Sequence, residues 1–163
     1  MGTERLLNLP PGYSPAEFPE TGITVPRPDG WFIATEYLKP NVKGLKIGIS
    51  SDPQTQFTVF FWWEVGSNER FKPSEQAQGI TSQKRKVLID DLQTEDDKER
   101  GFITYRATFY VPDEDKINYI ETTANDEEGT LHIATFETPR DTWEQYRETA
   151  KVLIEKTVWE NLD

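Results

Sequence analysis

The sequence predicts an α+β fold, an α/β/α sandwich in which a central, mainly antiparallel sheet carries a helix on each face. Three observations predict it. Residues 57–65 are apolar on both faces of a strand, and such a strand needs cover on each side of its sheet. Three β segments follow one another through short turns between residues 102 and 137, which makes them antiparallel neighbours. A long amphipathic helix then closes the chain.

The composition fits a packed domain and excludes several classes of function. Aromatic side chains make up 12% of the 163 residues, whereas disordered chains lack them. The absence of cysteine excludes disulfides, thiolate metal sites and cysteine nucleophiles. With 29 acidic and 18 basic residues, the formal charge of −11 would repel a phosphate backbone, so we expect no nucleic-acid partner.

Residues 1–22 form a proline-rich N-terminal arm in which we expect no regular structure, because four prolines accompany Gly12 and Gly22. Either this arm packs on its own domain, residues 23–163, or its apolar side chains bind a partner. We take the apolar residues of the arm as the candidate partner-binding residues. They are Leu6, Leu7, Leu9, Tyr13 and Phe18.

The first strands of the domain are predicted by turn residues and alternation. Residues 22–26 form a short strand that ends in the turn residues 26–30. Residues 31–37 form the next strand, and a loop over 39–44 follows. Residues 45–50 alternate apolar and polar side chains, as a half-buried strand does.

The strand over residues 57–65 carries most of the aromatic run. Phe60 and Trp62 lie on one of its faces, opposite a row of five apolar residues. We interpret this run as core, with a ligand pocket as the alternative. The opposite row consists of Phe57, Val59, Phe61, Trp63 and Val65.

A helix is predicted over residues 73–88, although Gly79 weakens it by about 1 kcal/mol relative to alanine. The acidic run over residues 90–99 is interpreted as a solvated hairpin. A loose divalent-cation site is the alternative, since the run lacks the spacing of an EF-hand loop.

The second half of the chain is predicted to contain strands over residues 102–111, 117–123 and 130–137. The closing helix covers residues 139–160, because Thr138, Pro139 and Asp141 are typical of a helix start. Its apolar stripe has the spacing of a helix that lies across a sheet. The stripe consists of Trp143, Tyr146, Ala150, Leu153, Ile154 and Val158.

Little in the sequence points to catalysis. The one histidine, His132, falls inside a strand, whereas catalytic histidines usually lie at loops or strand ends. We interpret it as structural or surface-exposed, with a catalytic or ligand role as the alternative. One imidazole without thiols cannot assemble a standard zinc site, and the common nucleotide-binding and hydrolase motifs are absent. We therefore expect a binding or scaffolding protein with no catalytic or metal-binding residues.

Two segments carry a resemblance to a known family. The first is Gly-Ile-Thr-Val-Pro-Arg-Pro-Asp-Gly-Trp over residues 22–31, a strand that ends in proline and precedes a tryptophan. The second runs through residues 105–111, 119–123 and 129–135 to Trp143 and the helix behind it. Together they resemble the PsbP family, the extrinsic subunits of photosystem II and their relatives, which share a sandwich fold with the Mog1 proteins.

The resemblance implies a non-enzymatic peripheral subunit, or an assembly or stability factor, of a photosynthetic membrane complex. It implies a monomer that binds protein subunits in the thylakoid lumen or on the thylakoid, with the arm in the place of the family's docking arm. The family is tied to calcium retention in the oxygen-evolving complex, but its ligand motif is not evident around His132. We therefore expect no cofactor other than a weak calcium site whose place is not located.

Other functions remain open at this stage. One is a small-molecule carrier in which Phe60, Trp62 and the closing helix wall an apolar cavity. Another is a Mog1-like regulator of a small GTPase. No stretch of sequence approaches the roughly 18 apolar residues of a membrane span, and residues 1–7 do not resemble a signal peptide. We expect either a cytosolic protein or a mature chain whose targeting segment has been removed.

Overall fold

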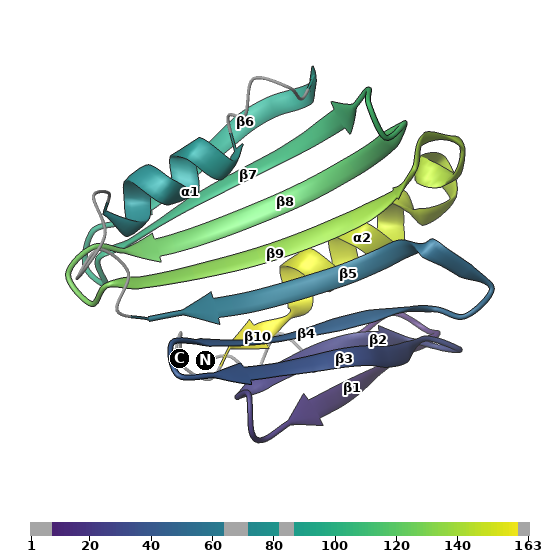
Figure 1. The fold of residues 1–163 in the computed structure, drawn as a ribbon, viewed down its shortest axis with the longest axis horizontal. Helices are drawn as coiled ribbons and strands as arrows, with labels where there is room; N and C mark the ends of the chain where they lie inside the picture. Colours follow the sequence, from purple (N-terminus) through teal and green to yellow (C-terminus); the bar gives the residue numbers. More distant parts are fainter. Residues whose placement is uncertain (1–7, 64–71, 82–86, 160–163) are drawn as a thin grey trace.

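A computed structural model describes residues 8–63, 72–81 and 87–159 of the chain, without the side chains of 81, 87, 90–93 and 159. Its main feature is an antiparallel sheet of seven strands in the order β3-β4-β5-β9-β8-β7-β6 (Figure 1). The strands are β3 (Phe32–Lys39), β4 (Val42–Ile49), β5 (Asp52–Trp62), β6 (Val87–Asp97), β7 (Phe102–Val111), β8 (Lys116–Asn125) and β9 (Thr130–Pro139).

One helix lies on each face of this sheet. Helix α1 (Pro73–Thr81) packs on β7, β8 and β9, and helix α2 (Trp143–Lys156) packs on the other face against β8 and β9. Figure 1 shows α1 in front of the sheet and α2 behind it. The α+β sandwich predicted from the sequence is therefore confirmed.

The doubly apolar strand β5 explains why both faces carry a helix. On the α2 side, Phe57 and Val59 are fully buried with Leu153 in the main core. On the α1 side, Trp62 packs against the smaller cluster around Ala77. Each face of β5 thus contributes to a different core, as alternating side chains on a central strand require.

A second, three-stranded sheet has the order β1-β2-β10 and packs on the α2 side of the main sheet. It consists of β1 (Tyr13–Phe18), β2 (Ile23–Pro28) and β10 (Val158–Trp159). Ile23 and Val25 of β2 are fully buried in the same core as Leu45 and Ile47 of β4. The small sheet and α2 thus cover this face of the main sheet together.

The segment that ends β2 places a tryptophan in the core. The N–H of Trp31 donates a hydrogen bond of 3.1 Å to the carbonyl of Pro28, which closes a turn in which Gly30 has a φ of 83°. Glycine adopts this left-handed conformation without strain. The indole of Trp31 then stacks on Phe136 and meets Tyr146 edge-on, with ring centroids 6.2 and 6.5 Å apart. The turn chemistry read from the sequence therefore serves to bury this ring.

Part of the arm departs from the prediction of irregular structure. Residues 13–18 form β1, which pairs with β2 from Tyr13 opposite Pro28 to Phe18 opposite Ile23. The expectation that this proline-rich segment forms no regular element is wrong there. Proline is tolerated in edge strands because it lacks only the donor, and β1 lies at the edge of its sheet.

Several predicted boundaries also change. Strand β4 begins at Val42, so a tight turn replaces the predicted loop over 39–44. The helix predicted over 73–88 ends at Thr81 in the described chain, and residues 87 and 88 belong to β6. The acidic run is the first strand of the β6–β7 hairpin rather than its turn, which lies at residues 98–101.

The closing helix is shorter than the 139–160 predicted. A 3-10 turn (Arg140–Thr142) precedes α2, and Thr157 is extended with a ψ of 133°. The chain then pairs with Thr24 and Ile23 through β10, so hydrogen bonding to β2 replaces the last helical turn. No helix in the described ranges is long and apolar enough to cross a membrane.

Candidate protein-binding surface

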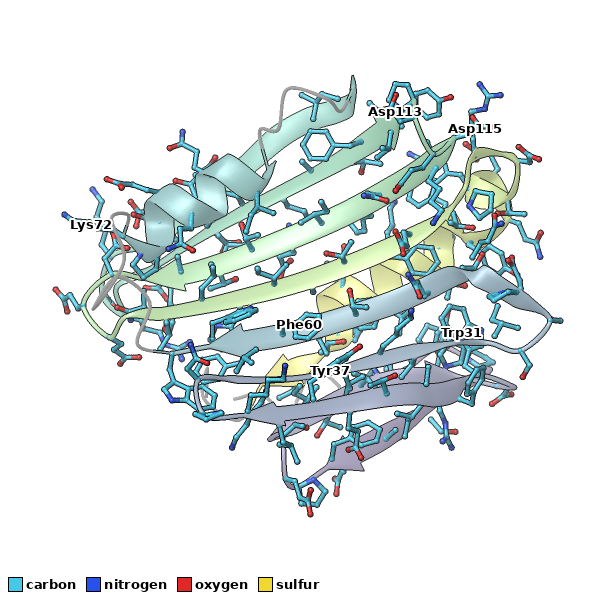
Figure 2. The ribbon with its side chains drawn as sticks, in the orientation of Figure 1. Trp31, Tyr37, Phe60, Lys72, Asp113 and Asp115 are labelled. Carbon is cyan, nitrogen blue, oxygen red and sulfur yellow. The ribbon has the colours of Figure 1, made fainter. Side chains whose placement is uncertain are left out.

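Neither of the two α-helices in the described residues covers the β3–β4 half of the sheet face that carries α1. Helix α1 covers β7, β8 and β9, whereas β3 and β4 lie beyond its reach (Figure 1). We call the uncovered part the open face and define it by Tyr37 of β3, Gly44 and Lys46 of β4, and Phe60 and Trp62 of β5. In Figure 2, Tyr37 and Phe60 lie in the lower half of the sheet, away from α1.

Three aromatic rings form a row across the open face. The centroids of Tyr37 and Phe60 are 5.3 Å apart, and those of Phe60 and Trp62 are 6.4 Å apart. Both distances lie in the range of favourable aromatic pairs. All three side chains are half-buried, and the row runs from the α1 cluster, which Trp62 contacts, to the edge strand β3.

Gly44 lets this row lie flat on the sheet. It stands opposite both Tyr37 and Phe60 in the strand register. A Cβ atom placed on Gly44 would come within 2.4 Å of Cδ1 of Phe60 and 2.6 Å of the carbonyl oxygen of Val59. The phenyl ring therefore rests on the backbone of β4, where only glycine leaves room.

The sequence predicts this surface only in part. Its alternation puts Phe60 and Trp62 on the second face of their strand and indicates core or a pocket wall there. It does not indicate Tyr37 or Gly44, because their positions relative to Phe60 depend on the strand register. A glycine inside a strand is the signal that could have indicated the close approach.

The predicted residues of the arm do not come together in one site. Phe18 packs against the main core, and Tyr13, at the other end of β1, is half-buried. Leu9 is half-buried just before β1, and Leu6 and Leu7 lie outside the described residues. For Phe18 this favours packing on its own domain. Partner binding by the arm stays a prediction.

His132 is buried beside Phe61 on the α2 side of the main sheet. It is 3% exposed, and its ring centroid is 4.3 Å from that of Phe61. Burial lowers the pKa of His132 to about 3, and a hydrogen bond with the backbone of Thr123 acts in the opposite direction. The imidazole is therefore neutral near pH 7, and its surroundings fit the structural interpretation of this residue.

The other candidate sites gain little from the structure. The described residues contain no group of three or more acidic, histidine or cysteine side chains that could hold a metal ion, so the predicted calcium site stays unlocated. Phe60 and Trp62 lie on the face opposite α2, so these residues and the closing helix do not wall one cavity.

One polar pocket lies beside β6 and β7, lined by Thr94, Glu95, Thr104 and Arg106. Its volume of about 170 Å³ is below the roughly 300–1,000 Å³ of most ligand sites. The Arg106 guanidinium already donates hydrogen bonds of 2.6 and 2.9 Å to the carboxylate of Glu121. A second anion would therefore have to compete with this ion pair.

Comparison with known proteins identifies the fold. The chain is similar to the solution structure of cyanobacterial PsbP (CyanoP) from Synechocystis sp. PCC 6803, with a TM-score of 0.59. The likeness covers 91% of this chain and 92% of that one at 14% sequence identity. No protein-family model and no curated protein sequence matches the chain. The protein therefore has a PsbP-like fold, as the resemblance read from the sequence implied.

Proposed function

We propose that this protein is a non-enzymatic peripheral subunit, or an assembly or stability factor, of a photosynthetic membrane complex of the photosystem II type. The observation that carries the proposal is the likeness to cyanobacterial PsbP, which extends over almost the whole of both chains. At 14% identity this likeness concerns the fold, so the function is an inference from it.

The surface chemistry supports binding to protein rather than catalysis. The open face presents a row of aromatic rings that neither described helix covers, and aromatic side chains are enriched at protein interfaces. The one histidine is buried and neutral, which leaves it unsuited to proton transfer near pH 7. We propose a monomer that associates with the thylakoid through protein subunits, in the lumen or on the membrane surface.

The test is binding to membranes that contain or lack the partner complex. Thylakoid membranes from a cyanobacterium are washed with salt to remove peripheral proteins and sedimented with the tagged full chain. Matched membranes come from a strain without photosystem II. We expect saturable binding to the first membranes and little to the second. Equal binding to both, or binding to neither, would reject the proposed function.

A matched pair of variants asks whether the open face takes part. Tyr37→Ser changes the outermost ring of the row, and Tyr110→Ser changes a tyrosine of β7 on the other face of the sheet. If the open face binds the complex, only the first substitution should weaken sedimentation with the membranes. Circular dichroism spectra that match the wild type would show that both variants fold.

A further inference from the structure

The two edges of the seven-stranded sheet differ in how they are protected. Among the strands that the structure describes, β3 forms one edge and β6 the other. Every residue of β3 except Tyr37 is exposed, although the strand is eight residues long. Three large apolar side chains are among the exposed residues: Phe32, Ile33 and Leu38 at 43%, 36% and 49%. A long apolar edge of this kind is a template for pairing with another strand.

Strand β6 is protected more strongly than β3. Its pairing with β7 is interrupted twice, between Leu88 and Asp90 and between Asp90 and Gln93. Five acidic residues occupy it, with no basic residue among them: Asp90, Asp91, Glu95, Asp96 and Asp97. Bulges and charged side chains both discourage strand addition. Strand β3 has a single irregularity, at Ala34, and only Glu36 and Lys39 as charged residues.

The charge around β3 also differs from that of the whole chain. Residues 32–49 contain three lysines, Lys39, Lys43 and Lys46, and one acid, Glu36, in a protein of net charge −11. None of these lysines forms an ion pair with a residue that the structure describes. Strand β3 itself is neutral, but the β3–β4 hairpin, with Lys43 and Lys46 on β4, has a net charge of +2 and attracts acidic partners.

These features select one kind of occupant. An outer edge strand presents unpaired N–H and C=O groups, which another polypeptide can satisfy and lipid chains cannot. A second copy of this chain could offer its own β3, but two hairpins of net charge +2 would repel each other, or it could offer β6, whose register is irregular at two places. Pairing of β3 with β6 of the next copy would also leave free edges and grow without closing.

We propose that the outer edge of β3 binds an extended acidic segment of a partner protein by strand addition. The incoming strand becomes the eighth strand of the sheet, and its backbone pairs with that of Phe32–Lys39. Its alternate side chains lie beside Tyr37 at the end of the aromatic row and beside Ile33 and Leu38. The inference rests on the proposed function only for the identity of the partner.

The first experiment needs no knowledge of that partner. A library of random twelve-residue peptides displayed on phage is selected on the full chain at low salt. We expect enriched peptides that alternate apolar and acidic residues and whose affinity falls as salt is added. In hydrogen–deuterium exchange, bound peptide should slow the amides of β3 at least tenfold and leave those of β6 unchanged, because only β3 gains backbone partners.

Two double variants of equal chemistry locate the site. Ile33→Glu with Leu38→Glu alters the β3 edge. Leu88→Glu with Ile89→Glu alters two side chains of β6 that are similarly exposed, at 45% and 47%. The first pair should weaken peptide binding about 30-fold or more, because it removes two apolar contacts and adds repulsion. The second pair should change peptide binding less than about twofold, since Leu88 and Ile89 lie at the far edge of the sheet.

A third variant blocks strand addition through the backbone. Ala34 has no partner in the register with β4, and proline is tolerated at such irregularities. Ala34→Pro should keep the fold and reduce peptide binding at least tenfold, because proline removes a backbone donor from β3 and its ring crowds an incoming strand. If this variant does not fold, the double Glu variant still decides the question.

The outcomes separate this inference from the proposed function. The inference is overturned if no peptide is enriched, if exchange slows elsewhere than β3, or if both double variants lose binding equally. It is also overturned if light scattering shows a dimer that the Ile33→Glu, Leu38→Glu variant dissociates and the Leu88→Glu, Ile89→Glu variant does not. Peptide binding at β3 without binding to photosystem II membranes would reject the proposed function alone. Membrane binding that neither the peptides nor the β3 variants reduce would reject the β3 site alone.

Discussion

Acidification should destabilise this fold through its single histidine. In the folded chain burial lowers the pKa of His132 from 6.5 to about 3, because a charged imidazole in this core would lose its hydration. In the unfolded chain the same group titrates near 6.5. Between these two values the unfolded state binds a proton that the folded state does not, so stability must fall as the pH is lowered.

The magnitude follows from the separation of the two pKa values. The contribution of His132 to the free energy of unfolding is fully present well above pH 6.5. Below that pH it is lost at about 1.4 kcal/mol per pH unit. At pH 4.5 the loss is about 2.7 kcal/mol, a large part of the 5–15 kcal/mol typical of a domain. The loss levels off only near the folded pKa of about 3.

The assay compares wild type with His132→Phe, a ring of similar shape that does not titrate and can still pack on Phe61. Free energies of unfolding in urea are measured from pH 7.5 to pH 4. The carboxylates change the free energy of unfolding with pH in both proteins, so only the difference in this free energy between wild type and variant is used. On acidification from pH 7.5 to pH 4.5, that difference should shift by about 2.7 kcal/mol in favour of the variant.

Two results would refute this reasoning. One is a difference between the proteins that stays constant within about 0.5 kcal/mol over that range, which is the scatter of such comparisons. The other comes from the imidazole signal in proton NMR, which is unambiguous in a chain with one histidine. Titration of that signal near pH 6.5 in the folded protein would show that His132 is accessible to solvent.

Three further predictions concern stability. Gly44→Ala should lower the free energy of unfolding in urea by about 1–3 kcal/mol, because its Cβ would meet the ring of Phe60 at 2.4 Å. Gly79→Ala in α1 has open space around it and should raise the free energy of unfolding by about 0.5–1 kcal/mol. Trp143→Ala should cost about 2–4 kcal/mol because the half-buried indole packs on the main core, and a loss below about 1 kcal/mol would contradict that packing. Deleting residues 1–18 should lower the melting temperature by at least about 5 °C, because the deletion removes β1. Deleting only residues 1–8 keeps β1 and should leave the melting temperature unchanged. If the arm binds the complex, this shorter deletion should weaken membrane binding.

The parts of the fold that could be predicted are those with strong local patterns. The strands over 102–111 and 130–137 follow from alternation and close turns, and both match β7 and β9 nearly to the residue. The closing helix follows from its apolar stripe, of which Ala150, Leu153 and Ile154 are buried. In these segments local propensity and tertiary packing favour the same structure.

The misplaced elements are those in which pairing outweighs local preference. Proline content argues against β1, yet the segment pairs with β2 over six residues. Acidic residues disfavour a strand over 90–97, yet on an exposed edge they stay solvated while the backbone pairs with β7. The sequence does not predict that Tyr37 and Gly44 lie beside Phe60 for the same reason, since neighbours across strands depend on a register that local sequence does not specify.

The arrangement of the two sheets separates stability from binding. Both helices pack on the C-terminal strands β8 and β9, and there the main sheet is covered on each side. The open face and the edge strand both belong to strands β3 to β5, and on the other face β4 and β5 share a core with the small sheet. Because that other face already supplies the core contacts of Leu45, Ile47 and Phe57, the exposed side chains of β3 are free to be selected for binding. Substitutions of Ile33 or Leu38 should therefore change affinity with little effect on stability, whereas those at Gly44 should change both.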